Sequence, residues 1–170
     1  MEKKSLVLSI DGACRGNHNR QIESRAAYGV YVGVCSPYNR FGRLDHHIQH
    51  TSSRAELEAA IQAIELVAQL QPVLHEQRTN KVILMMDSDY VYKTMTEYVW
   101  NWAKRDGLRP SGKAAAHWEA IKSLHHRIYE LERKMDLRIL FWWVNREDNY
   151  KADRLANLAL DSADSAYGSS

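Results

Sequence analysis

Cysteine is scarce in this chain of 170 residues, which contains only Cys14 and Cys35. Two thiols cannot build the several disulfides that hold small secreted domains together, and they cannot supply a zinc site with four thiolate ligands. We therefore expect both thiols to be reduced, as is usual in the cytosol or the nucleus.

Long apolar runs are also missing. The first run, over residues 6–10, ends at Asp11, whereas a secretory signal needs about 7–15 apolar residues and a membrane-spanning helix about 20. The sequence thus predicts no secretory or membrane signal, a cytoplasmic or nuclear location, and no membrane partner.

A strong excess of one charge is absent as well, because 23 Lys and Arg stand against 21 Asp and Glu, a formal net charge of +2. This balance excludes a histone-like polycation but not an enzyme that acts on nucleic acid, since the local distribution of charge matters more than the total. With 45% hydrophobic and 26% charged residues the composition is that of a folded protein. The length predicts one domain over residues 1–163, with a flexible C-terminal tail over 164–170.

The hydrophobic pattern predicts an α/β protein. Strands are predicted over 6–10, 28–34, 43–49, 82–86 and 137–144, and helices over 53–70, 89–102, 115–134 and 149–162. We expect Gln71 and Pro72 to end the first helix. Three consecutive strands favour an antiparallel meander, and strands separated by helices favour parallel crossovers. The order therefore predicts a five-stranded mixed sheet covered by helices.

Acidic residues stand at four positions of interest. Asp11 and Asp87 each follow an apolar strand, and parallel strands would bring both carboxylates to the same end of the sheet. Glu56 falls near the apolar stripe of the first helix, where a charge is costly unless it is paired or binds a cation. Asp153 opens the last helix. Each has an ordinary alternative: a turn for the two strand-end aspartates, a capping carboxylate for Glu56, and dipole compensation for Asp153.

Together the four acids predict a cluster of carboxylates from four separate elements. Such a cluster repels itself unless divalent cations neutralise it, and oxygen-only ligands suit Mg²⁺ or Mn²⁺. Two such ions about 3.5–4 Å apart can activate a water and stabilise a leaving oxygen. The pattern therefore indicates metal-dependent phosphodiester cleavage.

The order of the motifs resembles type 1 ribonuclease H over residues 6–159. The resemblance is carried by residues 10–17 (IDGACRGN), 27–31 (AYGVY), 51–57 (TSSRAEL), 86–91 (MDSDYV) and 144–156 (VNREDNYKADRLA). It implies the ribonuclease H-like fold, a five-stranded mixed sheet with the first three strands antiparallel and helices on both faces. It also implies an endonuclease that cleaves the RNA strand of RNA·DNA hybrids and leaves 3′-hydroxyl and 5′-phosphate ends. The family's catalytic, metal-binding acids match Asp11, Glu56, Asp87 and Asp153, which would hold two Mg²⁺ ions, with Mn²⁺ as a substitute.

The same resemblance implies a set of substrate contacts. Residues matched to contacts with the RNA backbone and its 2′-hydroxyls are Cys14, Gly16 and Asn17. At the start of the first helix, Thr51 matches a threonine that helps to hold a DNA phosphate, and Ser52 and Ser53 stand where many members carry Asn and Gln that donate to the minor-groove edge. An aromatic and basic handle for the DNA strand matches Tyr98, Trp102, Lys104, Arg105 and Ser111. The rings of Tyr98 and Trp102, one helical turn apart, would face a deoxyribose, whereas Trp100 and Trp118 are expected to pack in the core.

Charge is distributed unevenly along the chain. Residues 104–134 hold eight Lys and Arg against four Asp and Glu, an excess of four positive charges beside a whole-chain net charge of +2. The rest of the chain is therefore slightly acidic, which fits an acidic metal site beside a basic groove for nucleic acid.

One departure from the family pattern concerns histidine. Most members carry a histidine shortly before the last aspartate, but all eight histidines here lie at or before His126. The loop 145–149 resembles that of a histidine-less branch, which implies a slower or differently pH-dependent enzyme in which Glu147 or Asp148 is a candidate substitute. His117, His125 and His126 are expected at the surface of the handle.

Three functions remain open from the sequence, and a monomer is expected for each. The first is a metal-dependent ribonuclease acting on RNA·DNA hybrids. The second is a non-catalytic nucleic-acid-binding module of the same fold, and the third is a same-fold nuclease with another duplex substrate. Retention of all four acids favours a catalyst over a binding module.

Overall fold

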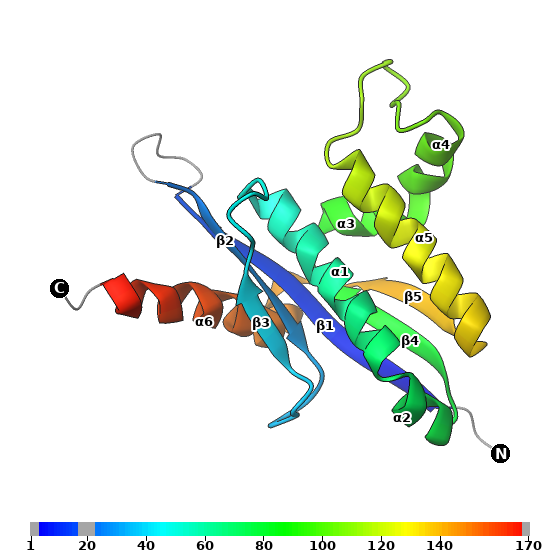
Figure 1. Cartoon of the computed structure of the whole chain (residues 1–170), viewed down its shortest axis with the longest axis horizontal. Helices are drawn as coiled ribbons and strands as arrows, with labels where there is room; N and C mark the ends of the chain where they lie inside the picture. Colours follow the sequence, from blue (N-terminus) through cyan, green and yellow to red (C-terminus); the bar gives the residue numbers. More distant parts are fainter. Residues whose placement is uncertain (1–3, 17–22, 168–170) are drawn as a thin grey trace.

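One mixed sheet organises the computed structural model, which describes residues 4–16 and 23–167. Its strands are β1 (Lys4–Arg15), β2 (Arg25–Tyr31), β3 (Arg40–Arg43), β4 (Thr79–Met86) and β5 (Arg138–Trp143), in the order β3-β2-β1-β4-β5. The first three strands pair antiparallel, whereas β4 pairs parallel with both β1 and β5. The predicted mixed sheet is thereby confirmed (Figure 1).

The helices cover both faces of this sheet. They are α1 (Ser52–Gln69), α2 (Gln71–Glu76), α3 (Asp89–Lys93), α4 (Val99–Lys104), α5 (Trp118–Met135) and α6 (Tyr150–Tyr167). Helix α1 packs on β1 and β2 with α5 beside it, and α6 packs on β1, β2 and β3 (Figure 1). Neighbouring residues of β1 separate the two layers, because Gly12 faces α1 while Ala13 packs against α6. Successive side chains of a strand point to opposite faces, so α1 and α6 lie on opposite sides of the sheet.

The core lies mainly between the sheet and α1. Helix α1 is capped by Thr51, whose Oγ1 accepts a hydrogen bond of 3.2 Å from the backbone N–H of Arg54. Its inward face buries Leu57, Ile64 and Val67 completely. Burying one such side chain contributes roughly 1.5–3 kcal/mol, so this face fixes the helix on β1 and β2.

Several element boundaries differ from the predicted ones. The third strand is Arg40–Arg43 and not 43–49, because the chain after Leu44 closes a turn in which Ile48 N–H donates to Asp45 O at 3.0 Å. By contrast, the first helix ends at Gln69, just before Gln71 and Pro72 as predicted, and Pro72 then stands in the first turn of the short helix α2, where its missing N–H removes no intrahelical hydrogen bond. The predicted helix 89–102 is α3 and α4 joined by a single π-helical turn over 94–98.

The last helix continues to Tyr167, beyond the predicted end at residue 162. Of the predicted tail, residues 168–170 lie outside the described residues, and the division into one domain and a tail stays a prediction. Among the helices of the described residues, none combines the length and the hydrophobicity that a transmembrane span requires.

Candidate active site

The four predicted carboxylates line one cavity. Asp11 comes from β1, Glu56 from the first part of α1, Asp87 from the residue after β4, and Asp153 from the first turn of α6. The cavity has a volume of about 240 Å³, and its other lining residues are Gly12, Ala13, Cys14, Ser52, Arg146 and Asn157. Residues that are up to 146 positions apart in the sequence thus meet at one place.

The strand register explains why Asp11 and Asp87 are neighbours. Ser9 of β1 is paired with Met85 of the parallel strand β4. Each aspartate lies two residues further along the chain, Asp11 within β1 and Asp87 one residue past the end of β4. The side chains at such positions share a face of the sheet. Strand β1 continues past Asp11 to Arg15, so Asp11 lies within a strand and the turn alternative does not apply to it.

Two glycines let the helices approach Asp11 from opposite faces. A Cβ atom added to Gly12 would lie 2.3 Å from the backbone N of Glu56, so α1 comes this close only because Gly12 has no side chain. Gly29, the cross-strand partner of Asp11, plays the same role for α6. A Cβ there would lie 2.5 Å from the carbonyl oxygen of Ala152, directly before Asp153.

We expect Gly29→Ala to destabilise the protein by about 1–3 kcal/mol, since backbone atoms of α6 would have to move to admit one methyl group. Gly33→Ala is the matched control, because the nearest atom to its added Cβ is 3.9 Å away. Its free energy of unfolding is expected to stay within about 0.5 kcal/mol. Urea denaturation of both variants measures the difference. Equal stabilities would show that α6 does not depend on Gly29.

Hydrogen bonds from neighbouring side chains fix the positions of two of the carboxylates. The Ser88 hydroxyl donates to Glu56 Oε2 at 2.5 Å. The Asn149 side-chain amide donates to Asp87 Oδ1 and to the backbone oxygen of Ile10, both at 2.9 Å, and this residue is only 1% exposed. The sequence pattern assigned no role to Ser88 or Asn149, although both stand inside the segments 86–91 and 144–156 that carry the family resemblance.

A second network holds Asp153. The Asn157 side-chain amide donates to Asp153 Oδ1 at 3.3 Å and to its backbone oxygen at 3.0 Å. Arg15 in turn donates to Asn157 Oδ1 at 3.2 Å and forms an ion pair with Asp161 at 2.7 Å. On the other side, Arg146 Nη2 lies 3.9 Å from Asp153 Oδ1. The pattern gave no sign of this network, because its members come from both ends of the chain.

The electrostatics of the cavity fit a cation. Burial, and then the charges of Asp87, Asp153 and Glu56, raise the pKa of Asp11 from 3.8 to about 8, although the Gly12 N–H bond opposes the shift. Burial also raises the pKa of Glu56, against the opposing effect of the Ser88 hydrogen bond. Neighbouring carboxylates repel one another when they ionise, and a bound divalent cation neutralises this repulsion. The donor set is made of oxygen atoms, which suits Mg²⁺ or Mn²⁺ rather than zinc.

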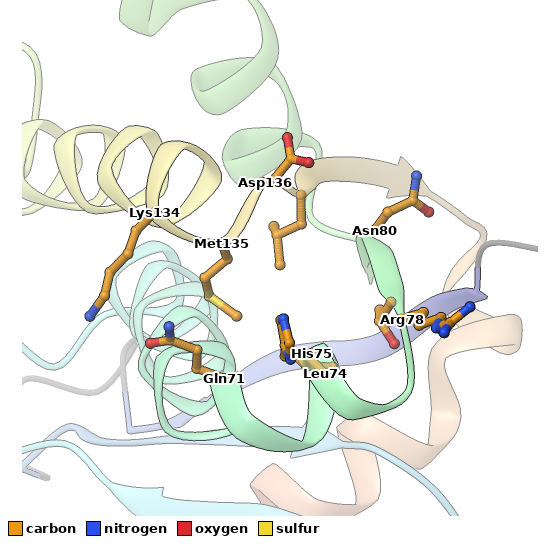
Figure 2. Close-up of a pocket in the computed structure, with 10 residues that line it drawn as sticks. Gln71, Leu74, His75, Arg78, Asn80, Lys134, Met135 and Asp136 are labelled. Carbon is orange, nitrogen blue, oxygen red and sulfur yellow. The ribbon is translucent and has the colours of Figure 1, made fainter.

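A larger cavity, of about 520 Å³, lies at the opposite end of β4 and β5 (Figure 2). It is formed by α2, the start of β4 and the end of α5, and His75 and Met135 reach toward its middle while Asp136 points away. Asp136 is the one acid among its lining residues. Without converging carboxylates this cavity cannot perform the chemistry predicted from the sequence.

Some of the residues predicted to contact the hybrid substrate line the acidic cavity. Cys14 and Ser52 line it, and burial raises the pKa of the Cys14 thiol, whose Sγ donates to the backbone oxygen of His50 at 3.7 Å. Gly16 follows β1 with a positive φ of 83°, and Asn17 lies outside the described residues. Thr51 caps α1, and Ser53 is half-buried in its first turn.

The structure corrects the predicted aromatic handle. Trp102 is only 9% exposed and belongs to the core, whereas Trp100, expected in the core, is 58% exposed. The physical reason is the apolar stripe formed by Val91, Met95 and Val99, which Trp102 continues at helical spacing. Trp102 therefore offers little of its ring surface to a deoxyribose. Tyr98 remains exposed, with its ring centroid 5.5 Å from that of Trp102.

Three polar residues of the predicted handle lie at the surface, and their contact with the DNA strand stays a prediction. Lys104, Arg105 and Ser111 are all exposed. Trp118 packs against the core, and Trp100 instead meets the ring of His125 edge-on, with centroids 4.6 Å apart. His126 is exposed, whereas His117 and His125 are half-buried and burial lowers their pKa values.

The sheet order together with four carboxylates around one cavity defines an α/β protein of the ribonuclease H-like fold. The solved structure of LC11-RNase H1, isolated from compost, superimposes with a TM-score of 0.68 at 22% identity, covering 96% of this chain and 99% of that one. RNase H1 from Halobacterium salinarum gives a TM-score of 0.57 at 22% identity, with coverage of 94% and 99%. At these identities the likeness shows the fold alone.

Sequence comparison shows the family. The family model described as RNase H matches residues 3–161. Ribonuclease H of Methylococcus capsulatus is 31% identical over 162 residues, covering 89% of this chain and 86% of the relative. Ribonuclease H1 of Homo sapiens is also 31% identical and is matched over 89% of this chain, but the chain spans only 48% of that relative's length. The chain therefore belongs to the RNase H family of enzymes.

Proposed function

We propose that this protein is an endoribonuclease that cleaves the RNA strand of RNA·DNA hybrids, leaving 3′-hydroxyl and 5′-phosphate ends. The observation that carries the proposal is the convergence of four carboxylates, from Asp11, Glu56, Asp87 and Asp153, on one cavity in a member of the RNase H family. A binding module needs no such cluster, which costs stability through mutual repulsion.

The family uses divalent metal, and we propose two Mg²⁺ ions held by the four carboxylates, with Mn²⁺ as a substitute. The raised pKa of Asp11 and the all-oxygen donor set support this assignment. Bound Mg²⁺ would supply an acidified water and neutralise charge at the departing 3′ oxygen. The chain's own part is to fix the ligands: Ser88 holds Glu56, Asn149 holds Asp87, and Asn157 holds Asp153.

Substrate binding is proposed along two surfaces. Cys14 and Ser52 line the cavity itself. Cys14, Gly16 and Asn17 would contact the RNA backbone and its 2′-hydroxyls, which distinguish RNA from DNA. Thr51 would help to hold a DNA phosphate, and Ser52 and Ser53 would donate to the minor-groove edge. The exposed Tyr98, Lys104, Arg105 and Ser111 would hold the DNA strand, with the two cations contacting phosphates. The buried Trp102 supports the ring of Tyr98 and is no longer proposed as a contact.

The loop before α6 carries no histidine. We propose that Arg146 is the residue of this loop that assists catalysis. Arg146 lines the cavity, whereas Glu147 and Asp148, the substitutes predicted from the sequence, do not line it; all three side chains are exposed. We expect Arg146→Ala to lower kcat/KM about tenfold, roughly 1.4 kcal/mol of transition-state stabilisation. The double variant Glu147→Ala/Asp148→Ala is expected to stay within about twofold. A greater loss in the double variant would return the role to one of these acids.

A substrate panel tests the proposed function. A labelled RNA·DNA hybrid, a double-stranded RNA, a DNA duplex with a single ribonucleotide and a plain DNA duplex are incubated with the protein and Mg²⁺. We expect cleavage of the RNA strand of the hybrid, with new 3′-hydroxyl ends. Faster cleavage of another duplex would establish a same-fold nuclease of different specificity, and binding without turnover in Mg²⁺ or Mn²⁺ would establish a binding module. Light scattering tests the expected monomer.

A further inference from the structure

The loop between β3 and α1 brings together three side chains of types that can bind metal ions. Nδ1 of His46 and Nδ1 of His47 each lie 3.8 Å from Oδ1 of Asp45. The ligand atoms of these three exposed residues are all within 4.8 Å of one another. We propose that Asp45, His46 and His47 form a binding site for a divalent transition metal of the zinc class, separate from the carboxylate site and independent of the proposed function.

The backbone of this loop is held in place before any ion binds. The N–H of Ile48 donates to the carbonyl oxygen of Asp45 at 3.0 Å, which closes a turn with His46 and His47 at its two corners. His50 Nε2 also lies 3.0 Å from that carbonyl oxygen. Metal binding therefore requires little further ordering of the chain, so the loss of conformational entropy that opposes it is small.

Both ends of the loop are anchored to the sheet. Leu44 is 6% exposed and packs in a small cluster with Ala26 and Ala55. At the other end, His50 Nδ1 accepts a 3.0 Å hydrogen bond from the N–H of Ala26. Both ring nitrogens of His50 thus make contacts within the fold. The imidazoles of the loop that remain available to bind a metal ion are those of His46 and His47.

The ligand types select the class of metal. Two imidazole nitrogens and one carboxylate oxygen suit Zn²⁺, Ni²⁺, Co²⁺ or Cu²⁺, whereas Mg²⁺ prefers oxygen atoms alone. Zinc ligands lie about 2.0–2.2 Å from the metal, so neighbouring ligand atoms of a tetrahedral site are about 3.4 Å apart. The two 3.8 Å separations exceed this by a few tenths of an ångström, which exposed side chains close by small rotations. Water would complete the coordination.

The chain offers a matched control in its second pair of consecutive histidines, His125 and His126. The ring of His125 packs against Trp100, and His126 Nε2 lies 3.3 Å from Glu130. These two histidines therefore face different partners and do not converge with an acid as His46 and His47 do. Because both pairs consist of two histidines, a difference in metal binding between them reports the arrangement of the side chains and not the type of residue.

The test is a titration of the ¹⁵N-labelled full chain with Zn²⁺, in excess Mg²⁺ to occupy oxygen sites, followed by ¹H–¹⁵N spectra. We expect saturable shifts of the amide signals of residues 45–48 in the wild type and in His125→Ala/His126→Ala. The shifts are expected to vanish in His46→Ala/His47→Ala, whose remaining spectrum reports that it folds. Asp45→Asn should weaken binding at least about tenfold.

Two results would overturn the proposal. One is the absence of shifts at residues 45–48 in the wild type at millimolar Zn²⁺. The other is the persistence of the same shifts in the double variant His46→Ala/His47→Ala. Failure of hybrid cleavage, by contrast, would refute only the proposed function, because the titration uses no nucleic acid.

Discussion

Replacing Asp11 or Asp87 by asparagine is expected to reduce Mg²⁺-dependent cleavage of an RNA·DNA hybrid at least about a thousandfold, or roughly 4 kcal/mol of transition-state stabilisation. Each substitution keeps the shape of the side chain but removes a negative charge from the centre of the acidic cavity. An amide binds Mg²⁺ more weakly than a carboxylate does, because the cation is hard and strongly hydrated. Single-turnover cleavage at saturating enzyme measures the loss.

Asp89→Asn is the matched control for these variants. Asp89 stands two residues after Asp87 but is exposed and pairs with Lys93 at 3.0 Å on the surface of α3. Its substitution removes the same charge from the same region of the chain and is expected to change the rate less than about threefold, the scale of a surface ion pair. If Asp11→Asn and Asp87→Asn cleaved as fast as Asp89→Asn, the carboxylate site would not be the catalytic centre.

The metal-free protein is expected to be destabilised by Asp11 as the pH rises. The pKa of Asp11 is raised from 3.8 to about 8, mainly by burial and then by Asp87. Between these two values the folded protein keeps a proton that the unfolded chain has released, so the free energy of unfolding falls with increasing pH. Asp11→Asn removes this dependence. It should exceed the wild type in stability by an amount that grows from pH 5 to pH 8, up to about 5 kcal/mol, since one pKa unit corresponds to about 1.4 kcal/mol.

Urea denaturation in a chelator at several pH values measures this difference between variant and wild type. Asp89→Asn serves again as the control, and its difference from the wild type is expected to show no such trend. Addition of Mg²⁺ should stabilise the wild type more than Asp11→Asn, because the ion binds the folded state of the intact site. A stability difference that is constant between pH 5 and pH 8 would contradict the assigned electrostatics of the cavity.

Much of the fold could be predicted because its signals are local. The apolar runs of β1, β4 and β5 and the helical period of α1 are visible within short windows of sequence. The weakest signal produced the clearest error: residues 43–49 are polar and alternate only weakly, and most of them form the turn that carries Asp45, His46 and His47. In that turn a hydrogen bond between neighbouring residues decides the conformation, and hydrophobic alternation does not report it.

The tryptophans of the predicted handle give a different lesson. The stripe of Val91, Met95 and Val99 leads by helical spacing to Trp102, so the sequence alone contained the evidence that this ring is buried. The family resemblance instead predicted that this ring faces a deoxyribose of the substrate. At this position the period of the helix was the better guide, because burial of a large ring is decided by the face on which it lies.

The sequence by itself determined the types of the main elements, their order, and the four acids worth testing, because each depends on residues that are near one another in the chain. Only the tertiary structure decided which side chains meet. Asn149 reaches Ile10 and Asp87 across 139 and 62 residues, and Arg15 reaches Asn157 across 142. Such contacts follow from strand register and from the close approach that Gly12 and Gly29 allow the helices. Both are properties of packed elements, which no single stretch of sequence contains.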